Sequence, residues 1–161
     1  MQPAPIPADE QQRLEALKAL GILDTKPDER FDAITKEAAA RLRVPISTVS
    51  LIDADREWYL SCQGLDIKEA KRETSFCGHA LFSKNIFIVE DTLKDPRFAD
   101  NPTVTGKPYI RFYAGVALYD NFYRLPIGVL CVKDTKPRSM SAEAAGILLE
   151  LAAKAETEIH A

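Results

Sequence analysis

Three cysteines and two histidines are the side chains of this chain with the chemistry for nucleophilic, redox or metal-binding roles. Cys62, Cys77 and Cys131 form no Cys-x-x-Cys pair, which argues against a disulfide framework and a structural zinc site. Cys77 and His79 lie two residues apart in a predicted helix, so their side chains diverge. We therefore expect neither a catalytic constellation nor a metal site.

The segment 91–112 gathers the polar side chains best suited to ligand recognition. Beside a predicted strand it supplies Arg97, Asn101, Lys107, Tyr109 and Arg111. A few convergent polar groups among aromatic residues are what small-molecule recognition needs. The Arg111 guanidinium can bind an anionic ligand, or it can pair with an aspartate of its own loop. We favour the aspartate, with Asp91 preferred to Asp95 and Asp100.

Aromatic residues from several predicted elements either line the same cavity or form ordinary core. Alternation along a strand places Phe112 and Ala114 on one side and Arg111 and Tyr113 on the other, and leaves open which side faces the cavity. The candidate ligand-binding residues are Trp58, Phe76, Cys77, His79, Phe98, Asn101, Arg111 and Tyr113. The sequence does not identify a cofactor.

Composition and charge exclude several function classes. The chain has 161 residues, a net charge of −3, 46% hydrophobic residues and 28% charged residues, which is ordinary for a globular domain. Neither half is basic, so we expect no nucleic-acid partner. No apolar run approaches the roughly 18 residues of a membrane span, and the N-terminus does not resemble a signal peptide. The lack of a signal peptide and the unpaired cysteines together favour a cytoplasmic location.

The hydrophobic pattern predicts an α+β fold. Helices are expected over residues 9–20, 26–43 and 74–84, with a closing helix after Ser141. Strands are expected over residues 46–53, 58–62, 86–90, 110–119 and 127–134. Short connections between successive strands indicate an antiparallel sheet with helices packed on it. We expect a flexible lead-in at residues 1–8 and a single domain over 9–161.

Several separated motifs in one order give the chain a family resemblance. They include SFCGHAL, DPRFADNPTVTGKPYIRFYAG and IGVLCVKDTKPRSMS. With these motifs the chain resembles the GAF domain family, in particular its bacterial sensory branch. The resemblance implies an antiparallel sheet of about six strands, with N- and C-terminal helices on one face and short helices and loops covering the other. The sixth strand is expected within 64–73 or 104–109.

The resemblance also implies a regulatory role. We expect a non-catalytic sensory module that binds a small molecule in bacterial signal transduction, and a homodimer formed through the terminal helices, where Leu149 supplies an outward apolar side chain. Two alternatives remain open at this point: a ligand-free dimerisation module, and a cysteine-based reductase of free methionine sulfoxide. Bilin attachment at Cys77 and cyclic-nucleotide binding are less favoured, because the motifs for both are incomplete or absent.

Overall fold

A six-stranded antiparallel sheet forms the centre of the computed structural model, which describes all 161 residues. The strand order is β3-β2-β1-β6-β5-β4. The strands are β1 (Ile46–Ile52), β2 (Arg56–Gln63), β3 (Glu69–Lys71), β4 (Phe87–Val89), β5 (Phe112–Tyr119) and β6 (Pro126–Asp134). All five strands expected from the sequence are present, and β3 is the short extra strand, in the first of its two expected places. β5 and β6 pair antiparallel, as predicted.

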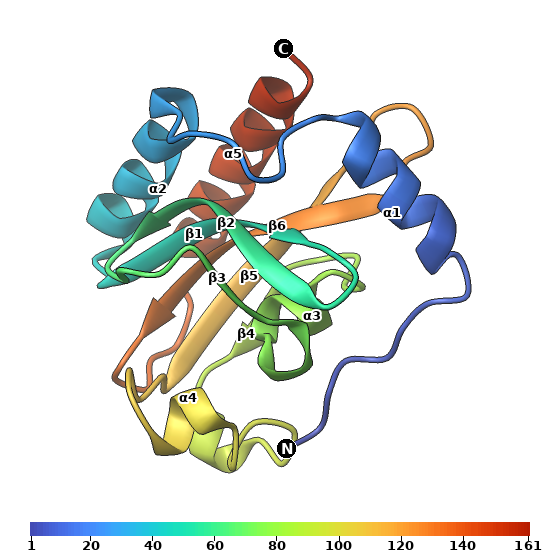
Figure 1. Cartoon of the computed structure of the whole chain (residues 1–161). Coiled ribbons are helices and arrows are strands. Elements are labelled where there is room, and N and C mark those ends of the chain that lie inside the picture. The colour runs from blue at the N-terminus through green and yellow to red at the C-terminus, as the bar shows by residue number, and fades with distance from the viewer.

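The helices divide between the two faces of the sheet (Figure 1). The long ones are α1 (Glu10–Ala19), α2 (Glu29–Leu42) and α5 (Ala142–Ile159). The other face carries α3 (Phe76–Ala80), α4 (Pro102–Thr105) and the single turns η1 (Arg72–Thr74) and η2 (Thr92–Lys94). This arrangement is the predicted α+β architecture. None of the helices combines the length and the apolarity needed to cross a bilayer.

Side-chain caps set the helix starts. The Ser141 hydroxyl accepts a hydrogen bond from the Ala144 amide at 3.1 Å, which begins α5 as predicted. The prediction for α2 was wrong by three residues. Asp28 is its cap and accepts from the Arg30 amide at 2.9 Å, whereas the Thr25 hydroxyl donates to the Ile22 carbonyl. An aspartate carboxylate beside the first turn is also favoured by the helix dipole.

Two hydrophobic cores lie on opposite faces of the sheet. The larger has 21 buried residues from the sheet and from α1, α2 and α5, so this face is closed by long helices. The smaller has 13 buried residues, among them Phe76, Phe98 and Tyr113, and is covered by short elements and loops. Short elements and loops, rather than long helices, therefore form the wall on this face.

A buried ion-pair network fixes α1 to the end of the sheet. Arg13 is fully buried and donates to the Ile52 carbonyl at 2.7 Å and to the Glu10 carboxylate at 2.8 Å. Arg72 donates to the same carboxylate and to the Asp53 carbonyl. Burial raises the pKa of Glu10, but the hydrogen bonds from Arg13 and Arg72 outweigh it and lower the pKa to about 2.

Glu10→Gln is therefore expected to destabilise the protein by about 2 kcal/mol at pH 7. Because the folded-state pKa is depressed, the stabilisation is complete above about pH 4.5 and is lost as the pH falls toward about 2. Urea unfolding at pH 7, 4.5 and 3 measures this, with the exposed Glu15→Gln on the same helix as control. A pH-independent difference between wild type and Glu10→Gln would contradict this account.

Candidate ligand-binding site

A cavity of about 290 Å³ lies between β2 and β6 and the short elements that cover them. Apolar side chains form most of its wall, including Leu65, Ile67, Phe76 and Ile110. Three polar side chains come from the strands: Glu57, Tyr59 and Lys133. An apolar cavity with a few placed polar groups has the general character of a small-molecule site.

Lys133 is the unusual member of this wall. It follows Val129 and Cys131 on the covered face of β6 and is only 6% exposed. Its ammonium makes no hydrogen bond or ion pair with the protein. It is not sealed from solvent, because no fully buried side-chain polar atom of the protein lacks a partner, and it reaches the open cavity. Burial lowers the pKa of Lys133, but the electrostatic influence of Cys131 and Glu57 outweighs this and holds the pKa above its ordinary value. The side chain is therefore a charged donor with space in front of it.

Glu57 connects the sheet to the cover. It is 1% exposed, and its two carboxylate oxygens accept hydrogen bonds at 2.6 Å from the hydroxyls of Ser50 and Ser75. Ser75 also caps α3 by accepting from the Gly78 amide at 3.0 Å. A change at Glu57 is therefore transmitted directly to the start of α3.

Tyr59 supplies a second donor. Its side chain is largely buried, and its hydroxyl, which makes no hydrogen bond with the protein, keeps contact with solvent in the cavity. Burial, followed by the nearby charge of Glu57, raises the pKa of Tyr59 well above its ordinary value. The phenol therefore keeps its proton and can donate it to an acceptor in the cavity.

Four of the residues proposed from the sequence form one group beside this cavity. Phe76 lines it and stacks on Phe98, with ring centroids 4.4 Å apart, and on Tyr113 at 5.2 Å. The Tyr113 hydroxyl donates to the Cys77 sulfur at 3.0 Å. Phe98, Tyr113 and Cys77 lie behind the cavity as packed core, so the covered face of β5 is the one that carries Tyr113.

Asn101 and His79 hold neighbouring segments rather than the cavity. Asn101 caps α4 and donates to the Thr74 carbonyl at 3.0 Å. The His79 Nε2 lies 2.8 Å from the Gln2 carbonyl, and burial lowers the pKa of His79. The Gln2 amide also donates to the Arg97 carbonyl at 3.1 Å, so the lead-in lies along the cover.

The structure contradicts the placement of two proposed residues. Trp58 lies in the core on the helix face, on the opposite side of the sheet from the cavity, because it alternates with Glu57 and Tyr59 along β2. Arg111 does not pair with Asp91 or any other aspartate. It donates to the Val104 carbonyl at 2.8 Å, at the end of α4, so it does anchor the loop, but through backbone.

Sequence analysis missed Glu57, Tyr59 and Lys133. A signal for Lys133 was present, because a lysine stands in phase with Val129 and Cys131 in a strand that is otherwise apolar on both faces. Glu57 and Tyr59 share one face of β2, but only the fold brings that face under the cover. Alternation along a strand therefore predicts which residues share a face, but it does not predict which face borders a cavity.

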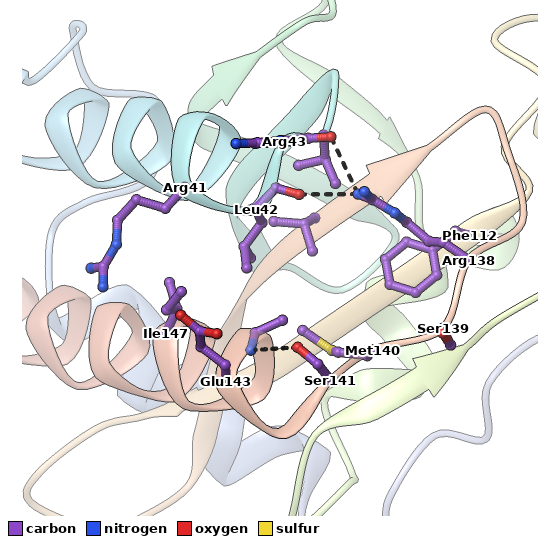
Figure 2. A pocket seen from close by; sticks show the side chains of 13 residues that line it. Arg41, Leu42, Arg43, Phe112, Arg138, Ser139, Met140, Ser141, Glu143 and Ile147 are labelled. Carbon is purple, nitrogen blue, oxygen red and sulfur yellow. Dashed lines mark hydrogen bonds between the residues drawn. The ribbon is translucent and has the colours of Figure 1, made fainter.

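A second hollow, of about 480 Å³, lies between the end of α2 and the start of α5 (Figure 2). Two of its three arginines already have partners, and the third, Arg43, is exposed. Arg138 donates to the carbonyls of Leu42 and Arg43 at 3.1 and 3.3 Å, and Arg41 pairs with Glu37 at 2.8 Å. With no free buried polar group, this hollow does not have the character of the Lys133 cavity.

The comparisons with known proteins identify the class. A family model for the GAF domain matches residues 26–159, so the chain belongs to the GAF domain family. A cyclic di-GMP phosphodiesterase of Pseudomonas aeruginosa is 42% identical over 146 residues, which cover 91% of this chain and 25% of the relative. The chain thus spans about a quarter of that relative's length.

Solved structures share the fold at low sequence identity. The GAF domain of an Acinetobacter phosphoenolpyruvate-protein phosphotransferase superposes with a TM-score of 0.68 at 21% identity, covering 92% of this chain and 93% of the other. A free methionine-R-sulfoxide reductase of Neisseria meningitidis gives 0.65 at 18% identity, covering 99% and 96%. At these identities the likeness concerns the fold alone.

The thiols differ in access. Cys77 and Cys131 are fully buried, whereas Cys62 is half-buried and lies 3.6 Å from the Leu65 carbonyl. Burial raises the pKa of Cys77. For Cys131, burial raises the pKa, but contact with the Cys77 thiol and the charge of Lys133 lower it below its ordinary value.

Native-state alkylation is expected to modify Cys62 first. Cys77 and Cys131 should react at least about a hundredfold more slowly, because they become accessible only when the core opens. Pulsed labelling followed by peptide mass spectrometry measures each rate, and labelling in urea provides the unfolded reference. Labelling of Cys131 as fast as that of Cys62 would instead support a redox role for that thiol.

Proposed function

We propose that this GAF domain is a non-catalytic regulatory module that binds a small molecule in a bacterial signalling protein. The observation that carries the proposal is the Lys133 ammonium, which is nine-tenths buried, without a protein partner, and bordered by a cavity. The ammonium offers its donors to the cavity, and no protein group accepts from them. A ligand that accepts from this ammonium in place of water supplies the selective binding that a sensor needs.

The relative supports a signalling context. We propose that the domain regulates an output such as cyclic di-GMP hydrolysis within a longer protein, as the name of the relative suggests. The regulator is a molecule other than cyclic di-GMP itself. Cyclic di-GMP contains two purines and two phosphates. It is therefore too large and too anionic for a cavity of about 290 Å³ that contains a single buried ammonium.

The route from ligand to output runs through the cover. A ligand that contacts Lys133 lies in the same cavity as Glu57 and Ser75, and Ser75 caps α3. Binding would favour one arrangement of the cover and thereby shift the population of conformations. In the same proposal the domain is a cytoplasmic homodimer formed through its terminal helices, with the 48%-exposed Leu149 of α5 in the contact.

A cavity-filling variant tests ligand binding without altering charge. Ala70 of β3 lines the cavity, so Ala70→Phe should occupy it, while Ala153→Phe on the exposed face of α5 is the matched control. We expect a library of small metabolites to contain molecules that raise Tm by about 5 °C at a hundredfold excess over Kd. Native mass spectrometry of freshly purified protein identifies any molecule that is already bound.

The stabilisation should disappear in Ala70→Phe and persist in Ala153→Phe. Stabilisation that is equal in both variants would place the binding elsewhere. A library with no stabilising molecule, together with ligand-free protein in native mass spectrometry, would favour the dimerisation module. Native mass spectrometry also reports the oligomeric state, and Leu149→Lys should reduce any dimer.

A further inference from the structure

The donors inside the cavity define the chemistry of its ligand. The Lys133 ammonium and the Tyr59 hydroxyl both border the cavity and both lack protein acceptors. An ammonium offers three donors and a phenol one, so the missing partner is a group of acceptor oxygens. An oxyanion has acceptor oxygens for both donors, and charge-assisted hydrogen bonds of this kind are about twice as strong as neutral ones.

The charges of the wall limit that oxyanion to one negative charge. Lys133 is the only cation among the buried lining residues, because Lys107 stands exposed at the rim. Glu57 belongs to the same wall, and both its oxygens already accept hydroxyls at 2.6 Å. A ligand with a second negative charge would lie beside this acidic side chain, and no arginine is present to clamp a phosphate bidentately.

The remaining wall and the size of the cavity describe the rest of the ligand. Leu65, Ile67, Phe76, Pro108 and Ile110 present carbon rather than hydrogen-bonding groups. A cavity of about 290 Å³ is at the small end of the range for ligand sites. An apolar body of one ring or a short chain fits this space.

We infer that the ligand is a small monoanionic organic acid, an inference that rests on the proposed function. Its carboxylate binds the Lys133 ammonium and the Tyr59 hydroxyl. Its apolar body lies against Leu65 and Ile110. The site thereby discriminates against phosphate monoesters through Glu57 and against neutral molecules through the unpaired ammonium. Specificity therefore comes from groups that reject as well as from groups that attract.

The test is calorimetric titration of the full chain with matched probes. Phenylacetate, benzoate and hexanoate are the acids, and phenyl phosphate, benzyl alcohol and benzylamine are the comparisons. We expect at least one acid to bind about tenfold more tightly than benzyl alcohol and more tightly than phenyl phosphate. Lys133→Met should remove this preference, and Tyr59→Phe should weaken acid binding by a few-fold.

Lys136→Met is the control, because Lys136 is an exposed lysine just beyond β6. It should leave the preference unchanged. If Lys133→Met does not fold, as judged by circular dichroism, Lys133→Gln replaces it, since its neutral amide keeps a polar tip. The inference is overturned if benzyl alcohol binds as tightly as the acids, or if phenyl phosphate binds more tightly than they do. It is also overturned if the Lys133 variant keeps the preference for acids, or if no acid binds at about 10 mM.

Failure of this inference is separable from failure of the proposed function. If library molecules lose their effect in Ala70→Phe but the acids are not preferred, the cavity is a ligand site and only the ligand class is wrong. If neither the library nor the acids bind, both proposals fail.

Discussion

A lysine ammonium inside the covered face of a β-sheet needs an acceptor, and the fold of this GAF domain provides none from its own side chains. Lys133 is 6% exposed, and its charge is retained because its surroundings hold its pKa above the ordinary value. The electrostatic influence of Cys131 and Glu57 offsets the cost of burying this charge, and the ammonium reaches the open cavity. Its N–H donors are therefore left to an acceptor in the cavity, which is water when no ligand is bound. The ligand-binding role that we propose for the covered face follows from the position of this one ammonium.

The two faces of the sheet differ in how firmly their covering elements are held. The helix face carries the larger core and the Glu10–Arg13–Arg72 network that fixes α1. The cover is held by the smaller core and by individual polar contacts: Ser75 to Glu57, Asn101 to the Thr74 carbonyl and Arg111 to the Val104 carbonyl. Each such hydrogen bond contributes about 1 kcal/mol net, so the cover can rearrange at a cost that ligand binding can supply.

The sequence predicted the architecture because local signals agreed. The apolar period of α5, the Ser141 cap and the alternation of β5 and β6 each indicated one structure, and the family motifs indicated the same sheet. The start of α2 was predicted three residues too early, because more than one residue near a helix start can cap it. The residues of the site were harder to predict from the sequence than the architecture. Phe76 was proposed and lines the cavity, but Trp58 was assigned to the wrong face of the sheet. Alternation shows which residues share a face, and only long-range packing decides which face is covered. Glu57, Tyr59 and Lys133 meet across strands far apart in sequence, and no local pattern records that meeting.

The most direct test of the central claim is a crystal structure of the freshly purified domain that resolves the Lys133 side chain. The account predicts an open cavity in which the Lys133 Nζ donates to an organic ligand or to ordered water, while Glu57 keeps its hydrogen bonds to Ser50 and Ser75. A collapsed cavity with a direct Lys133–Glu57 ion pair would contradict it, because the ammonium would then be satisfied by the protein and would need no ligand.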